Sequence, residues 1–146
     1  MIPGPLYLGA DHAGFALKEA LRAALAGAGA DVRDLSPSFQ EGDDYPAPGF
    51  AVAEAVASDP SARGILVCGS GVGVAIAANR IPRARAVVGH DEDEVALARR
   101  HNDANILALS GRTQGVAEAL PLVHRFLGTA PDPEDRHHRR VRQLDA

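Results

Sequence analysis

The sequence predicts a three-layer α/β/α protein built on a Rossmann-like, doubly wound sheet of five parallel strands. Two observations lead to this prediction. Short apolar runs alternate with alanine-rich helical patterns along the chain, and polar or glycine-rich segments follow the apolar runs directly. The chain has 146 residues, which is enough for one domain and too few for two ordinary ones. We therefore expect residues 1–146 to form a single domain.

The first half of the chain alternates strands and helices. Leu17, Leu21 and Leu25 recur every four residues, which places them on one face of a helix. Pro46 and Pro48 suit the first turn of another helix, because the proline ring is compatible with helical φ there. The expected elements are a strand at 6–9, a helix at about 14–28, a strand at 31–35, a polar loop at 36–44, a helix at 46–57 and a strand at 65–67.

The second half continues the alternation after a glycine loop. Acidic residues at 91–94 suit the first turn of a helix, and the basic residues Arg99, Arg100 and His101 suit its last turn, because each complements the helix dipole. The expected elements are a helix ending at about 79, a strand at 85–88, a helix at 91–101, a strand at 106–109, a helix at 114–126 and, after a linker at 128–132, a basic helix at about 133–144.

Composition excludes several classes of protein. The formal net charge is −4 and tryptophan is absent, which argues against general binding to nucleic acid or to an acidic membrane. No apolar run approaches the roughly 18 residues of a membrane helix, and the N-terminus does not resemble a signal peptide. The single cysteine, Cys68, cannot form an internal disulfide. We expect a cytoplasmic protein.

The most informative segment is the glycine loop that follows the third strand, Cys68-Gly69-Ser70-Gly71-Val72-Gly73-Val74-Ala75. Alternate glycines allow the backbone to approach a ligand and to direct several N–H groups at an anion, and a helix N-terminus follows. The spacing does not match a dinucleotide-binding fingerprint, because Val74 and Ile76 stand where glycine or alanine would be required. The same glycines could instead serve only a tight turn.

Four candidate side chains are expected at this end of the sheet. Cys68 ends a strand, where it is either a small buried hydrophobic residue or a thiolate stabilised by backbone N–H groups. Asp11 and His12 follow the first strand; Asp11 could simply cap a helix, but a cap does not explain His12. Arg112 follows the fifth strand. Because the carboxyl ends of parallel strands share one edge, these groups should face a common ligand.

A second set of candidates lies near the ends of the last helices. His101 and Asn102 follow a helix, where both residue types are common. Arg136 and Arg140 are four residues apart and share a helix face, so with Arg112 they could hold a phosphate dianion, although a basic tail can also be a solvated surface. The histidines are not predicted to bind metal, because no spaced cysteine, histidine and carboxylate cluster accompanies them.

The order of motifs along the chain is more specific than any single motif. In sequence they are Gly9-Ala10-Asp11-His12-Ala13-Gly14 with Leu17-Lys18, Asp44-Tyr45-Pro46, Cys68-Gly69-Ser70-Gly71-Val72-Gly73, Ile76-Ala77-Ala78-Asn79-Arg80, His101-Asn102-Asp103-Ala104-Asn105 and Arg136-His137-His138-Arg139-Arg140-Val141. This series resembles the ribose-5-phosphate isomerase B family of sugar-phosphate isomerases over nearly the whole chain.

The resemblance implies an aldose–ketose isomerase of the pentose phosphate pathway that interconverts ribose 5-phosphate and ribulose 5-phosphate through an enediolate, without cofactor or metal. The implied catalytic residues are Cys68 as general base, His101 as the acid/base that opens the furanose ring, and Ser70, which replaces a more usual threonine. Some members carry a glutamate where Val74 stands here, so the cysteine version is implied. The implied binding residues are Gly69, Gly71 and Gly73 for the enediolate, Asp11, His12 and Asn102 for the sugar, and Arg112, Arg136 and Arg140 for the phosphate.

The expected topology separates these residues. A helix of ten residues is roughly 15 Å long, so the helix at 91–101 should carry His101 and Asn102 to the pole opposite Cys68. We expect them to serve the site of a neighbouring chain, in a homodimer or tetramer with shared sites. Open alternatives are a galactose 6-phosphate or allose 6-phosphate isomerase on the same scaffold, a non-catalytic sugar-phosphate or nucleotide sensor, and a purely structural domain.

Overall fold

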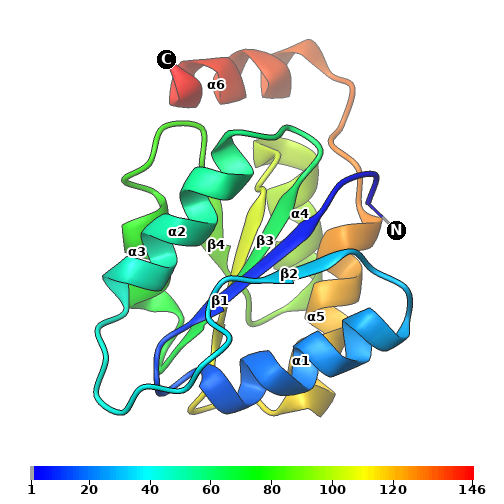
Figure 1. Ribbon diagram of the computed structural model, residues 1–146. Helices are drawn as coiled ribbons and strands as arrows, with labels where there is room; N and C mark the ends of the chain where they lie inside the picture. The colour runs from blue at the N-terminus through cyan, green and yellow to red at the C-terminus, as the bar shows by residue number, and fades with distance from the viewer. Residues whose placement is uncertain (1) are drawn as a thin grey trace.

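A single sheet of five parallel strands forms the centre of the protein in a computed structural model that describes residues 2–146 (Figure 1). Each neighbouring pair of strands is parallel, which confirms the predicted sheet. The strands are β1 (Leu6–Ala10), β2 (Val32–Asp34), β3 (Arg63–Cys68), β4 (Ala86–Val88) and β5 (Ile106–Ser110), in the spatial order β2-β1-β3-β5-β4.

Helices cover both faces of the sheet (Figure 1). Side chains of α1, α4 and α5 share a hydrophobic cluster with one face, and side chains of α2 and α3 share a second cluster with the other face. The predicted three layers are therefore confirmed. Within residues 2–146, no helix combines the length and the apolar character that crossing a membrane requires. The helices are α1 (Phe15–Gly27), α2 (Pro46–Ala57), α3 (Val72–Ala78), α4 (Glu92–Asn102), α5 (Val116–Gly128) and α6 (Asp135–Asp145).

The continuous apolar runs of the sequence are the central strands. Both faces of a parallel sheet are covered by helices, so successive side chains are buried on opposite faces and the polar alternation of an exposed strand is lost. All five residues of β5 are buried, as are the last five of β3. Leu17, Leu21 and Leu25 form the buried face of α1, as their spacing predicted.

The strand order marks the place in the sheet where a ligand is expected to bind. β1 pairs with β2 on one side and with β3 on the other. The chain thus changes direction across the sheet between β2 and β3. In open α/β sheets, ligands bind beyond the carboxyl ends of the strands at such a reversal, and here those ends carry Asp11 and Cys68.

A buried lysine fixes the loop beside the carboxyl end of β1. Lys18 is completely buried, and its Nζ donates hydrogen bonds to Glu19 at 2.6 Å, Asp34 at 2.7 Å and the Ser36 carbonyl at 2.7 Å. The Ser36 hydroxyl in turn accepts from the Ala10 N–H at 3.1 Å. Hydrogen bonds from Arg22 and then from Lys18 lower the pKa of Glu19 from 4.5 to about 2. The stabilisation that the ionised Glu19 carboxylate provides is therefore complete above pH 4.5 and is lost as the pH falls towards 2.

We expect Lys18→Met to lower the free energy of unfolding by about 3 kcal/mol, because it leaves the Asp34 carboxylate largely buried without its cation. Urea unfolding at neutral pH measures this. Arg22→Met is the matched control: it removes a cation from the same Glu19 at a side chain that is 41% exposed, and should cost much less stability than Lys18→Met. Equal losses in the two variants would contradict the assigned role of Lys18.

Candidate active site

Three candidate segments meet at the carboxyl edge of the sheet, where adjacent strands β1, β3 and β5 end. In the register, Ala10 lies beside Val67 and Cys68 lies beside Ser110. The Asp11 N–H donates to the Val67 carbonyl at 3.3 Å, and the Gly111 N–H donates to the Cys68 carbonyl at 2.8 Å. The segments that contain Asp11, Cys68 and Arg112 are thus joined by backbone hydrogen bonds.

The glycine loop closes around the Cys68 thiol. Its Sγ accepts a hydrogen bond from the Gly71 N–H at 3.2 Å, and the side chain is only 4% exposed. Gly71 has φ +81°, and a Cβ at this position would lie 3.0 Å from the backbone of Leu109, so the turn requires glycine. A second N–H, from Val72, donates to the Ser70 hydroxyl at 3.2 Å. The loop therefore directs one backbone donor at the sulfur.

The Arg112 guanidinium lies against this loop. Its backbone N–H donates to the Gly69 carbonyl at 3.2 Å, and a Cβ added at Gly69 would lie 3.0 Å from Cζ of Arg112. The Ser110 hydroxyl, which sequence reasoning did not single out, donates to the same carbonyl at 2.6 Å. Glycine at 69 thus lets a cation approach the segment that carries Cys68. A site of this kind can hold an anion beside a thiol.

Asp11 and His12 play different parts at the end of β1. The Asp11 carboxylate is 7% exposed and accepts from the Gly14 N–H at 3.0 Å, so it closes the turn into α1. His12 is exposed, and its backbone N–H donates to the Asp43 carboxylate at 2.7 Å. Its Nδ1 lies 3.1 Å from the Asp43 carbonyl and 3.2 Å from the carboxylate. The sequence does not reveal the role of Asp43, because nothing in its loop marks it as the partner of His12.

Asp43→Asn should lower the pKa of His12. Hydrogen bonds to the Asp43 backbone carbonyl and then to its carboxylate raise the pKa of His12 above 6.5, and the substitution weakens the second of these because the amide oxygen of asparagine is uncharged. Because the folded pKa is raised, the stabilisation from this contact is complete below pH 6.5 and is lost as the pH rises through the folded value. An NMR titration of the imidazole resonances measures the change. Asp44→Asn is the control, and an unaltered titration of His12 in Asp43→Asn would contradict the assignment.

The other predicted residues lie at the opposite pole of the molecule. α4 starts after the carboxyl end of β4 and runs back, so His101 and Asn102 are near the amino ends of the strands, where α6 crosses (Figure 1). Arg136 and Arg140 are exposed on α6, and Arg136 Nε lies 2.8 Å from Glu134. Within one chain, these residues are therefore far from Cys68 and Arg112. For His101 and Asn102, this separation was predicted from the length of the helix that carries them.

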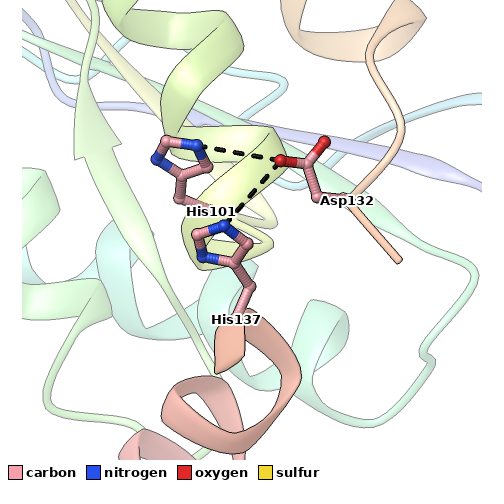
Figure 2. A group of neighbouring side chains, drawn as sticks. All are labelled: His101, Asp132 and His137. Carbon is pink, nitrogen blue, oxygen red and sulfur yellow. Dashed lines mark ion pairs between the residues drawn. The ribbon is translucent and has the colours of Figure 1, made fainter. Parts of the chain in front are cut away.

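Figure 2 shows a group at this second pole that the sequence did not reveal. The imidazoles of His101 and His137 are stacked, with ring centroids 4.3 Å apart and planes within 6°. Nε2 of His101 lies 3.7 Å, and Nε2 of His137 3.8 Å, from Oδ2 of Asp132. Burial, and then the charges of His101 and Arg136, lower the pKa of His137 and favour its neutral form. Asp132 was missed because it belongs to the linker, near His137 in sequence but far from His101, and no pattern marks it as a partner of either histidine.

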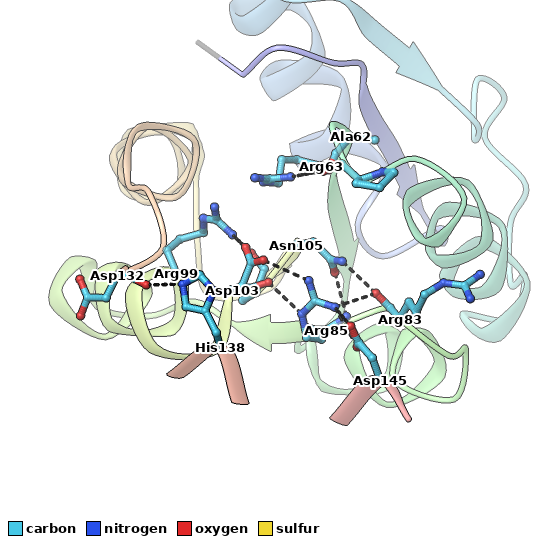
Figure 3. Close-up of polar contacts among 12 residues, drawn as sticks. Ala62, Arg63, Arg83, Arg85, Arg99, Asp103, Asn105, Asp132, His138 and Asp145 are labelled. Carbon is cyan, nitrogen blue, oxygen red and sulfur yellow. Dashed lines mark hydrogen bonds and ion pairs between the residues drawn. The ribbon is translucent and has the colours of Figure 1, made fainter. Parts of the chain in front are cut away.

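A polar network attaches α6 to the amino ends of the strands (Figure 3). Arg85, just before β4, donates from Nη1 to the Asp145 carboxylate at 2.9 Å. Its backbone N–H donates to the Asn105 side chain at 2.8 Å. Arg99, which is 2% exposed, donates to Asp103 at 2.8 Å. Side-chain hydrogen bonds at the second pole therefore hold α6 in position over α4.

Comparison with known proteins agrees with the resemblance in the motifs. A family model described as ribose/galactose isomerase matches residues 6–144. The chain is 42% identical over 137 residues to a ribose-5-phosphate isomerase B of Mycolicibacterium paratuberculosis, covering 93% of this chain and 86% of that protein. It is 41% identical over 138 residues to a ribose-5-phosphate isomerase B of Escherichia coli, covering 94% of this chain and 92% of that protein.

Solved structures show the same fold. A ribose 5-phosphate isomerase from Thermotoga maritima superimposes with a TM-score of 0.91 at 41% identity, covering 97% of each chain. A ribose-5-phosphate isomerase B from Mycoplasma genitalium with bound ribulose-5-phosphate gives a TM-score of 0.91 at 36% identity, covering 99% of this chain and 95% of that one.

Proposed function

Because this chain belongs to the ribose/galactose isomerase family, we propose that it is an aldose–ketose isomerase that interconverts ribose 5-phosphate and ribulose 5-phosphate. The observation that carries the proposal is the Cys68 thiol, which accepts the Gly71 N–H beside the Arg112 guanidinium. A thiolate in this position is a base next to groups that attract a phosphorylated sugar. The names of its relatives support ribose 5-phosphate as the substrate.

In the proposed mechanism, the Cys68 thiolate removes the C2 proton of the open-chain aldose, and the electron pair of that bond moves onto the C1 carbonyl oxygen to give an enediolate. The C2 hydroxyl then passes its proton to the C1 oxygen, and Cys68 returns its proton to C1, which leaves a hydroxyl at C1 and the ketone at C2. N–H groups of the loop at 69–73 stabilise the enediolate, His101 opens the furanose ring, and Ser70 supports the loop. A positioned base contributes about 100- to 10,000-fold, and one oxyanion donor about 100- to 1,000-fold. Proton transfers of this kind need no redox cofactor and no metal.

The residues of this mechanism come from two chains in our proposal. Cys68 and Arg112 of one chain meet His101, Asn102, Arg136 and Arg140 of another, in a two-fold dimer with two shared sites, or in a tetramer of such dimers. The opposite positions of α6 and the glycine loop support this arrangement (Figure 1).

The exposed apolar side chains of α3 offer a surface for the second copy. Val72 is 49% exposed and Ile76 is 59% exposed.

The remaining parts of the proposal concern binding groups and location. Asp11 and His12 contact the sugar, and a protonated His12 adds positive charge to the end of the sheet that binds the phosphorylated substrate. Residues 1–146 act as one domain. We also place the enzyme in the cytoplasm, since its single cysteine must stay a free thiol in order to act as a base.

A hexose-phosphate isomerase is the second candidate, because the description of the matching family includes galactose. The test is turnover of ribose 5-phosphate, galactose 6-phosphate and allose 6-phosphate by the purified full chain with EDTA present. We expect the highest kcat/KM with ribose 5-phosphate. Preference for a hexose phosphate would replace the substrate but keep the mechanism. Tight binding of ribose 5-phosphate without turnover of any substrate would identify a sensor and contradict the proposal.

A further inference from the structure

Three potential metal ligands converge between α4, the linker and α6. One ring nitrogen of His101, one ring nitrogen of His137 and a carboxylate oxygen of Asp132 all lie within 4.8 Å of one another (Figure 2). The two nitrogen–oxygen distances, 3.7 and 3.8 Å, are too long for hydrogen bonds. His137 is 94% buried, and its Nε2 has no hydrogen-bond partner among residues 2–146. An unpartnered buried nitrogen of this kind is costly unless a ligand uses it.

The donor set suits a first-row divalent cation. Two imidazole nitrogens and one carboxylate oxygen are a common zinc ligand set in sites that keep a further position open. In a tetrahedral site with bonds of about 2.0 Å, neighbouring ligand atoms are about 3.3 Å apart. The observed separations exceed this value by only a few tenths of an ångström for each histidine and Asp132. The group lines a pocket of about 180 Å³, so the open position can be reached from outside.

The protein holds Asp132 in place by its backbone. The Asp132 N–H donates to the Arg100 carbonyl at 2.9 Å, and the Asp132 carbonyl lies 2.8 Å from Nε2 of His138. Arg100 directly precedes His101 on α4, and His138 directly follows His137 on α6. The carboxylate is therefore presented to both imidazoles from a fixed main chain. Such preorganisation lowers the entropy cost of binding an ion.

We propose that His101, Asp132 and His137 form a binding site for Zn²⁺ or a similar first-row divalent cation, and that the bound ion inhibits the isomerase. The lone pair of each Nε2 lies in its ring plane, so two parallel rings must open towards a shared ion. His137 is packed, whereas the side chain of His101 is 43% exposed and can turn. The bound ion thus occupies the Nε2 lone pair of His101 and turns its ring, so that His101 can no longer act as the acid/base that opens the sugar ring. The inhibition rests on the proposed function of His101; the metal binding does not.

Cobalt titration of the full-length protein, first freed of metal with EDTA, tests the binding directly. We expect visible d–d absorption bands that saturate at one Co²⁺ per chain and disappear when Zn²⁺ is added. Asp132→Asn and His101→Gln should each weaken metal binding about tenfold or more, since changes even outside the ligand shell often cost 10- to 100-fold. His124→Gln, an exposed histidine on α5, should bind as wild type does. Circular dichroism checks that each variant is folded.

The alternative outcomes are distinct. Unchanged cobalt bands in Asp132→Asn and His101→Gln, together with their loss in Cys68→Ser, would move the metal to the thiol and overturn the proposal. The absence of any saturable band would mean that His101, Asp132 and His137 hold at most a bridging water, and it would also overturn the proposal. Zinc should also slow wild-type turnover of ribose 5-phosphate reversibly, and inhibit Asp132→Asn only at about tenfold higher concentration. Failure of turnover in EDTA would contradict the isomerase function but leave the cobalt result intact.

Discussion

Cys68→Ala should lower kcat for ribose 5-phosphate by about 100- to 10,000-fold, or about 3 to 5 kcal/mol of transition-state stabilisation. The sulfur is the proposed base, and alanine offers no group that can take its proton. KM should change little, because Arg112 and the loop glycines keep the phosphate and oxygen contacts. Steady-state kinetics with pentose phosphate measures both constants.

Cys68→Ser separates the base from the structure of the loop. The serine hydroxyl can still accept the Gly71 N–H that the sulfur accepts at 3.2 Å, so the strand-to-helix turn should be kept. A neutral hydroxyl is a far weaker base than a thiolate, and this variant should be nearly as inactive as Cys68→Ala. Thermal unfolding confirms that both variants are folded. Activity within tenfold of wild type in either folded variant would show that Cys68 is not the base.

A heterodimer of Cys68→Ala and His101→Ala chains should recover about half of the wild-type activity, although each homodimer is inactive. If Cys68 and His101 of different chains share a site, one site of this heterodimer carries both mutations and the other carries neither. Co-expression with two affinity tags and sequential purification isolates the mixed dimer. Because half of the sites are intact, kcat per dimer should be halved while KM stays at the wild-type value.

The matched control reverses the outcome. In a heterodimer of wild type with a chain carrying both Cys68→Ala and His101→Ala, every shared site contains one mutation, so we expect no activity. If each chain instead formed its own complete site, this control would be half active and the first heterodimer would be inactive. The two preparations contain the same mutations in the same number, so differences in stability cannot produce the crossover.

Much of the fold could be predicted from the sequence because its signals are local. The apolar runs at 65–67 and 106–109 are buried on both faces, and the four-residue spacing of Leu17, Leu21 and Leu25 marks one helix face. These patterns depend on the period of the backbone itself. Only the ends were displaced: β3 begins at Arg63, and α6 begins at Asp135 rather than about 133.

The strand order was not predictable in this way. Hydrophobic periodicity shows that an element is buried but does not identify the strand beside it. The order β2-β1-β3-β5-β4 follows from how helices pack on the two faces. This order brings Cys68 beside Ser110 and joins the Arg112 segment to the glycine loop.

For the candidate site, the sequence alone indicated which residue types stand at strand ends and helix ends, and hence Cys68, the loop glycines, Asp11 and Arg112 at one pole. The side-chain partners became visible only in the folded protein: Asp43 lies against His12, and Asp132 lies between His101 and His137. Contacts between different elements could not be predicted because they depend on how whole elements pack. Such packing leaves no periodic trace in the local sequence.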